Sequence, residues 1–139
     1  MNTYLVQEIL KEDEGYRQMM YLDTLGIPTI GYGRNLRDRG VTQEEATYLL
    51  SNDIAASEQD CERNFAFWWT IPSAAQDVLV CLAFNMGISK LQEFHKTLAH
   101  IEKGEWQEAG NQLLQSRWAH QVGVHRSHRM ADMLRNCGA

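Results

Sequence analysis

The stretch DEGYRQMMYLDTLGIPTIGYG, residues 13–33, decides the fold of this chain. Pro28 and the glycines at positions 26, 31 and 33 break any helix, while the β-branched and aromatic residues between them favour strands. The segment Asp23–Gly26 has the composition of a hairpin turn. We therefore expect a small antiparallel sheet here, in a sheet lobe of about residues 15–40.

The return strand of this hairpin is expected to present an open face. A period of two places Thr29, Gly31 and Gly33 on one side, with Ile30 and Tyr32 packing inward on the other. Because the first side is almost bare of side chains, a bulky ligand can approach the backbone there. The same glycines are also compatible with turn chemistry alone.

Helical patterns flank the sheet on both sides. Residues 2–14 place apolar side chains on one face and stop at Gly15, a natural C-cap. Thr42-Gln43-Glu44-Glu45 is a capping box, and it opens a helix to about residue 63 that is long enough to connect two lobes. Residues 73–76 form a second capping box, which opens a nearly all-round apolar helix that we expect to be central and buried.

The remaining sequence predicts a helical lobe of about residues 64–139. Its aromatic cluster at residues 65–69 is expected to join the core. Three shorter helices are expected near residues 91–103, 105–117 and 126–136. The pattern as a whole predicts a single domain of the α+β class, mostly helical, with the helix of residues 2–14 packing near the helical lobe.

The composition fits a globular chain of 139 residues, with 44% hydrophobic and 22% charged residues. The net charge is -5, yet residues 116–139 carry four arginines against one acid, which suits either contact with an anionic polymer or a solvated helix face.

Cys61 and Cys81 lie in apolar segments and are expected to be buried thiols, which favours a reducing cytoplasm. The first residues lack a basic start and an apolar run, so we expect no signal peptide and no membrane anchor.

Two carboxyl groups are candidates for chemistry. Glu14 falls in the last turn of the first helix, where the negative end of the helix dipole is expected to raise its pKa. Asp23 falls in the polar hairpin turn and is expected to stay ionised, with Thr29 close enough to hold a water beside it. Carboxyl groups in such opposed environments are typical of glycoside cleavage. A solvated acidic helix end is the alternative for Glu14, and no sequence pattern for a metal, a phosphate loop or a nucleophile competes.

Three motifs resemble those of the phage-type lysozymes, the family of the T-even phage enzyme (glycoside hydrolase family 24). These motifs are Asp13–Arg17, Tyr21–Thr24 and Pro28–Gly33. The spacing Glu-x8-Asp-x5-Thr matches the acid, carboxylate and threonine of the family. Further similar segments lie at residues 41–46, 83–87, 104–106, 116–118 and 123–129. The chain departs from the T-even branch at Arg34, where that branch has a histidine, and in a short interlobe loop.

The resemblance implies a two-lobed lysozyme-like fold and a muramidase. Such an enzyme hydrolyses the β-1,4 bond between N-acetylmuramic acid and N-acetylglucosamine and thereby lyses cell walls. Glu14 would be the general acid, while Asp23 positions or activates the attacking water and Thr29 holds it from the other side. The family inverts the anomeric configuration, which implies carboxyl groups about 6.5–9.5 Å apart. The substrate-binding residues implied are Gly33, Asn35, Phe84, Asn85, Thr97, Gln112 and Arg126.

The same resemblance implies no cofactor and no metal. It implies a monomer whose partner is bacterial peptidoglycan, with no nucleic acid and no stable membrane association. The protein would be made in the host bacterial cytoplasm and reach the wall by a holin-type release route or as a virion component. Two alternatives stay open: a lytic transglycosylase, which needs one glutamic acid and no second carboxylate, and a non-catalytic peptidoglycan-binding or virion structural module.

Overall fold

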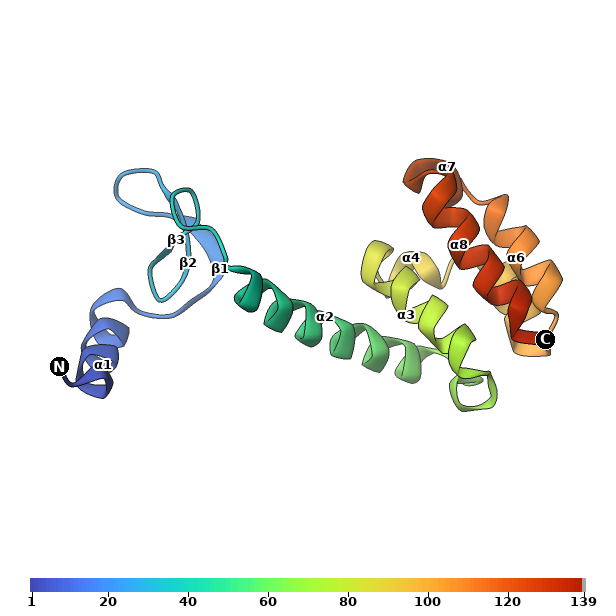
Figure 1. Ribbon diagram of the computed structural model, residues 1–139, viewed down its shortest axis with the longest axis horizontal. Coiled ribbons are helices and arrows are strands. Elements are labelled where there is room, and N and C mark those ends of the chain that lie inside the picture. The colour runs from blue at the N-terminus through green and yellow to red at the C-terminus, as the bar shows by residue number, and fades with distance from the viewer. Residues whose placement is uncertain (139) are drawn as a thin grey trace. The chain divides into compact units, whose positions relative to one another are not determined.

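The computed structural model describes residues 1–138 and divides into two compact units, Met1–Leu49 and Leu50–Ala139 (Figure 1). Helices make up 68% of the chain, and the strands form one small antiparallel sheet. These findings confirm the predicted α+β class and its mostly helical content. The long helix α2 (Gln43–Asn64) begins in the first unit and ends in the second.

The first unit begins with helix α1 (Thr3–Glu14), as the sequence predicted. The side chain of Asn2 caps its start by accepting a hydrogen bond from the backbone N–H of Leu5 at 3.0 Å. Gly15 is the C-cap, and its N–H donates to the carbonyl of Lys11. Its φ of 70° is a backbone conformation that glycine adopts far more readily than other residues. Glu14 is therefore the last helical residue.

Three short strands follow α1 (Figure 1). They lie in the order β1-β2-β3 in one sheet, and neighbouring strands are antiparallel. They are β1 (Arg17–Leu22), β2 (Pro28–Gly31) and β3 (Arg34–Asn35). In the predicted hairpin, Tyr21 lies opposite Thr29 and Leu22 lies opposite Pro28. A bulge interrupts the register nearer the start of β1.

The predicted alternation along residues 29–33 is wrong. Thr29, expected on the open side, is buried within β2, whereas Tyr32, expected to pack inward, is half exposed and packs against Tyr16 with ring centroids 5.6 Å apart. For the residues after β2 the cause is backbone geometry: Gly31 and Gly33 have φ values of 68° and 77°, which turn the chain out of the extended conformation. A period of two holds only while the chain stays extended, so it cannot place residues 32 and 33.

The first predicted capping box is confirmed at the start of α2. The hydroxyl oxygen of Thr42 accepts from the backbone N–H of Glu45 at 3.1 Å, and the Glu45 carboxylate accepts from the N–H of Thr42 at 2.9 Å. These reciprocal bonds satisfy two donors that the first turn of a helix leaves free. The helix ends at Asn64, within a residue of the predicted end.

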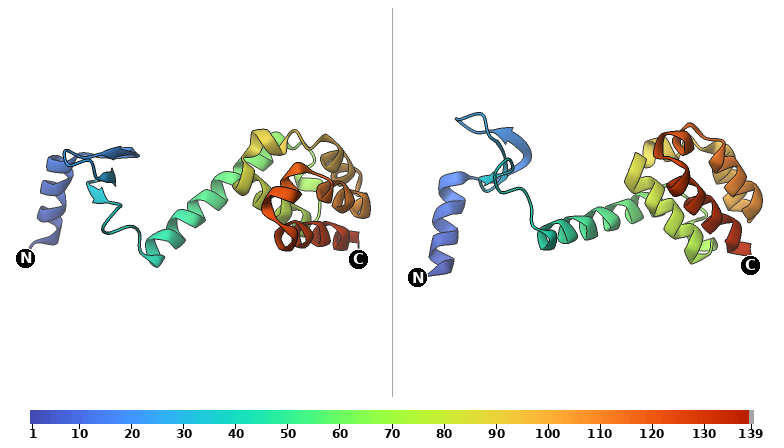
Figure 2. Two further views of the ribbon diagram at one scale, coloured as in Figure 1. Left: turned by 90° about the horizontal axis from the view of Figure 1, so that it is seen from above. Right: turned by 45° about the horizontal axis from the view of Figure 1, so that its top comes forward.

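The second unit is helical and surrounds one apolar core. Its central helix α3 (Ser73–Met86) buries Val78, Leu79 and Leu82, and α8 (Val124–Arg135) packs against both α3 and α6 (Figures 1 and 2). The other elements are η1 (Trp68–Thr70), α4 (Ile88–Leu91), α5 (His95–Lys103), α6 (Trp106–Leu114), α7 (Arg117–Val122) and η2 (Asn136–Gly138).

Several predicted helix boundaries in this unit are wrong. The second capping box is absent because Pro72, with φ of -63° and ψ of 155°, takes the N-cap position. The Gln76 amide instead donates to the carbonyl of Trp68 at 2.9 Å. The helix expected over residues 91–103 begins only at His95, as α5, and the short helix α4 precedes it. The helix α7 was not expected, although Ser116 caps it by accepting from the N–H of Ala119.

The central helix α3 is not buried on all sides. Cys61 is fully buried in α2, as predicted, but Cys81 is exposed, contrary to the prediction. Positions 77, 81 and 84 follow one another at helical spacing on the face opposite the core, and all three are exposed. The aromatic prediction holds for Phe65 and Trp68, which are buried, and fails for Trp69, which is 73% exposed.

Candidate active site

The hairpin turn between β1 and β2 fixes the carboxylate of Asp23. Its Oδ1 atom accepts hydrogen bonds from the backbone N–H of Leu25 at 2.8 Å and of Ile27 at 2.9 Å. The backbone N–H of Asp23 donates to the carbonyl of Ile27 at 3.0 Å, which closes the turn. An aspartate commonly bonds to N–H groups two or more residues ahead in this way, so the local sequence is sufficient to orient this side chain.

Ile27 links Asp23 to the buried hydroxyl of Thr29. The Thr29 Oγ1 atom donates to the carbonyl of Ile27 at 2.8 Å, the same oxygen that accepts from the N–H of Asp23. Thr29 is only 4% exposed, so its hydroxyl is held in a fixed environment. Since a hydroxyl has one proton, and this proton is already donated, Thr29 can act toward any further group only as an acceptor.

The carboxyl group of Glu14 lies against the backbone of Gly33. A Cβ atom placed on Gly33 would be 2.8 Å from Oε2 and 3.0 Å from Cδ of Glu14. A side chain at position 33 would therefore displace the carboxyl group, which is the flexible end of an exposed side chain. The sequence predicted that Gly33 faces a ligand, and it missed this contact with Glu14 because the two residues lie on different elements.

The Asn35 side chain is engaged within its own turn. Its Oδ1 atom accepts from the backbone N–H of Asp38 at 2.8 Å, and its amide donates to the Asp38 carboxylate at 3.0 Å. These bonds stabilise the chain after β3. A role for Asn35 in substrate binding stays a prediction.

The implied substrate-binding residues of the second unit line two pockets. Asn85, Thr97 and Gln112 meet in a pocket of about 870 Å³. Phe84, Asn85 and Arg126 line another of about 630 Å³. Asn85 contributes to both, and its Oδ1 atom accepts from the indole N–H of Trp118 at 2.8 Å. The other four predicted substrate-binding residues of this unit therefore each line a pocket that Asn85 also lines.

The basic C-terminal segment is not uniform. Arg129 lines the smaller pocket, as Arg126 does. Arg135, in contrast, donates to Asp132 at 3.1 Å and to Asn111 at 2.6 Å, and its stem packs beside Gly110. The guanidinium of Arg135 therefore holds α8 to α6 and is not free to capture a polymer.

Over residues 1–138, no three His, Cys, Asp or Glu side chains gather closely enough to hold a metal ion. Within the same residues, no helix combines the length and the apolar character needed to cross a membrane.

The chain matches one known protein family over most of its length. The sequence profile described as phage lysozyme covers residues 11–132, so the chain belongs to the phage lysozyme family. This is a class of peptidoglycan-hydrolysing glycosidases.

Individual relatives agree with this assignment. Probable T4-type lysozyme 1 of Dictyostelium discoideum is 24% identical, over 93% of this chain and 92% of that protein. Probable T4-type lysozyme 2 of the same organism is 28% identical, over 81% and 84%. The pre-baseplate central spike protein Gp5 of Enterobacteria phage T4 is 29% identical over 83% of this chain, which spans only 25% of that longer protein.

Proposed function

We propose that this protein is a muramidase that hydrolyses the β-1,4 bond between N-acetylmuramic acid and N-acetylglucosamine. Glu14 is the general acid, and Asp23 and Thr29 together hold the attacking water. The observation that carries this proposal is the double use of Ile27, which binds the Asp23 carboxylate through its N–H and the Thr29 hydroxyl through its carbonyl.

This arrangement orients a water by its two protons. A water beside Asp23 and Thr29 donates one hydrogen bond to the carboxylate. It donates the other to Thr29 Oγ1, because that hydroxyl has already given its own proton to Ile27. With both protons directed toward the protein, an oxygen lone pair remains to attack the anomeric carbon of the sugar. Holding a reactant in this way removes much of the entropic cost of the attack.

The proton balance of the reaction follows from these roles. As the bond between the anomeric carbon and the leaving oxygen breaks, Glu14 gives its proton to that oxygen. The water oxygen bonds to the anomeric carbon from the opposite face, and its proton passes to Asp23. Attack from the opposite face inverts the anomeric configuration. The two proton transfers leave Glu14 ionised and Asp23 protonated. Exchange with solvent then removes the proton from Asp23 and returns one to Glu14, which regenerates the starting state.

The second unit is proposed to bind the polymer. The pocket lined by Asn85, Thr97 and Gln112 combines amide and hydroxyl groups, which suit the acetamido and hydroxyl groups of the substrate. Phe84 and Arg126 line the other pocket. An exposed phenyl ring suits the apolar face of a sugar, and a guanidinium suits the carboxylates of peptidoglycan.

The route to the cell wall is proposed to be either separate release from the host cytoplasm or incorporation in a virion. The similarity to a phage spike protein supports the second route. Detection of the protein in purified virions by mass spectrometry separates them.

The catalytic assignment is tested with purified peptidoglycan and three variants. Glu14→Gln and Asp23→Asn should each lower the rate by orders of magnitude, since the first cannot give up a proton and the second loses the charge that assists the water. Glu12→Gln, which removes a carboxylate near the same helix end, is the matched control and should retain the wild-type rate. A Glu14→Gln variant with more than a few per cent of the wild-type rate contradicts the role of Glu14.

The products distinguish the alternatives. Hydrolysis gives reducing muropeptides whose new anomeric centre is inverted by NMR, while a lytic transglycosylase gives anhydro-muropeptides that are one water lighter. Full activity of Asp23→Asn together with the lighter product would establish the transglycosylase. Binding to peptidoglycan without any turnover would establish a non-catalytic module.

A further inference from the structure

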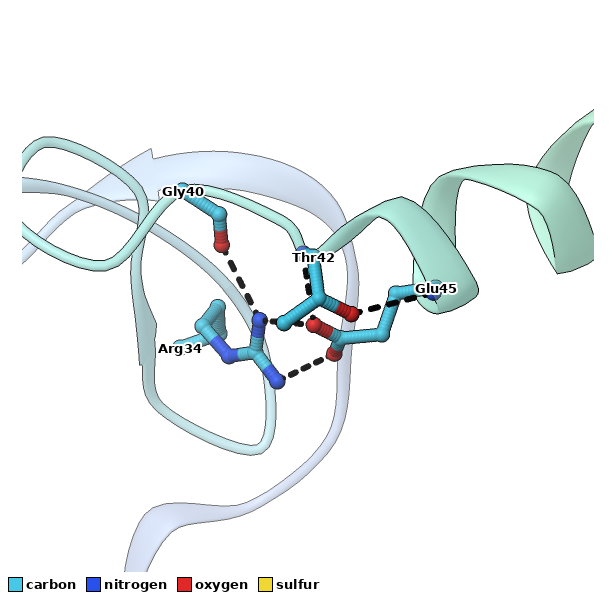
Figure 3. Close-up of polar contacts among 4 residues, drawn as sticks. All are labelled: Arg34, Gly40, Thr42 and Glu45. Carbon is cyan, nitrogen blue, oxygen red and sulfur yellow. Dashed lines mark hydrogen bonds and ion pairs between the residues drawn. The ribbon is translucent and has the colours of Figure 1, made fainter.

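Arg34 forms a two-pronged ion pair with Glu45 in the first unit (Figure 3). Its Nη1 atom donates to Oε1 of Glu45 at 3.0 Å, and its Nη2 atom contacts Oε2 of the same carboxylate. Nη1 also donates to the carbonyl of Gly40 at 3.0 Å. The two side chains are 30% and 37% exposed, so the pair is partly sheltered from solvent. A planar guanidinium facing a carboxylate in this way fixes orientation as well as distance.

The Glu45 carboxylate has a second role in the same place. Its Oε1 atom also accepts from the backbone N–H of Thr42, as part of the capping box of α2. Hydrogen bonds from Arg34 and then from Thr42 lower the pKa of Glu45 to about 2, so the carboxylate is charged throughout the neutral range. The Arg34 side chain therefore ties together the start of β3, the end of the following loop and the first turn of α2.

The backbone next to Arg34 needs such an anchor. Arg34 directly follows Gly33, and both Gly31 and Gly33 adopt positive φ values. Glycine gives the chain little intrinsic stiffness, so contacts made by the neighbouring residues must hold the backbone in place. The pairing of Ile30 with Arg34 supplies one such contact, and the pair with Glu45 supplies another.

Gly33 is the residue whose backbone lies against the Glu14 carboxyl group. We propose that Arg34 and Glu45 are positioning residues, which hold the backbone of Gly33 against Glu14 and thereby fix the place of the acid. This inference rests on the proposed role of Glu14. It assigns to the ion pair an effect on the catalytic step in addition to its effect on the fold.

The test compares kcat and KM on soluble peptidoglycan fragments. Arg34→Met and Glu45→Gln should each lower kcat about tenfold, because displacing a catalytic group by a fraction of an ångström is enough for such a loss, while KM changes less than twofold. Arg34→Lys keeps the charge and should restore part of the loss. The double variant Arg34→Met/Glu45→Gln should fall no further than either single variant, because each change breaks the same pair.

Two variants separate positioning from mere loss of stability. Thr42→Ala removes the cap hydroxyl but keeps the pair of Arg34 and Glu45, so it should lower the Tm and leave kcat unchanged well below that Tm. Arg37→Met breaks an exposed pair with Asp38, which is 3.4 Å long, and removes the same charge in the same unit. It should behave as the wild type.

The outcomes are distinct. An unchanged kcat in Arg34→Met, or an equal loss of kcat in Thr42→Ala and Arg34→Met, overturns the positioning role. Failure of the proposed function itself would be seen differently, as an inactive wild type or an active Glu14→Gln variant.

Discussion

Replacing Gly33 by alanine tests the contact between this residue and Glu14. At φ of 77° an alanine is strained by roughly 1–2 kcal/mol, and the stiffer unfolded chain offsets about 0.4–1 kcal/mol of this. The net loss of folding stability is therefore about 1 kcal/mol. The new methyl group would also be 2.8 Å from Glu14 Oε2, where non-bonded atoms prefer about 3.5 Å. The carboxyl group must retreat by roughly 0.7 Å.

Such a displacement acts on catalysis more than on stability. A misplacement of about 1 Å can cost about a hundredfold in rate, so we expect Gly33→Ala to lower kcat by roughly tenfold to fiftyfold. Gly31→Ala is the matched control, because Gly31 has a similar φ of 68° and no atom lies within 4 Å of the added carbon. It should lose about the same stability and keep the wild-type kcat.

Two measurements on each variant decide the matter: thermal unfolding, and kcat on soluble peptidoglycan fragments well below the Tm. Equal kcat values for Gly33→Ala and Gly31→Ala would refute the reasoning, since strain alone would then account for both. A rise in KM at constant kcat would instead return Gly33 to the substrate-binding role predicted from the sequence.

Three further outcomes are expected. Because the pKa of Glu45 is lowered from 4.5 in the unfolded chain to about 2, its ionised form stabilises the fold above pH 4.5, and this contribution is lost as the pH falls toward 2. The Tm difference between wild type and Glu45→Gln should therefore be constant above about pH 5 and shrink between pH 4.5 and 2. A thiol reagent should label Cys81 rapidly in the native protein, whereas Cys61, whose pKa burial raises to about 12, should react only on unfolding. In sedimentation with whole cell walls between about 0.05 and 0.5 M salt, Arg129→Ala should flatten the salt dependence of binding, whereas Arg135→Ala should leave it unchanged and lower the Tm.

The sequence predicted best those features whose partners are close along the chain. The helix ending at Gly15, the Asp23 turn and the Thr42 capping box each depend on residues at most four positions apart. Backbone sterics and short side chains determine these motifs whatever the rest of the chain does. The hydrogen bonds that link Asp23 and Thr29 through Ile27 lie within the same hairpin.

Features that depend on competition or on distant partners were missed. Residues 73–76 have the sequence of a capping box, but Pro72 takes the N-cap position one residue earlier and the box does not form. The exposed face of α3 could not be predicted, because apolar residues occur all around that helix and its sequence does not distinguish a buried face from an exposed one. The bond between Asn85 and Trp118 joins residues 33 positions apart, and no local pattern indicates it.

The same limit applies to the surroundings of Glu14. The catalytic role of Glu14 was predicted from its spacing to Asp23 and Thr29. The groups that surround it come from elsewhere in the chain: Gly33 lies between β2 and β3, and Arg34 pairs with Glu45 eleven positions later. The one sequence signal was the arginine at position 34. A histidine there would be charged only below about pH 6.5, whereas an arginine is always charged. Because the pKa of Glu45 is lowered to about 2, its carboxylate is also ionised in the neutral range. We therefore expect the pair to persist there and to hold the backbone of Gly33 beside Glu14.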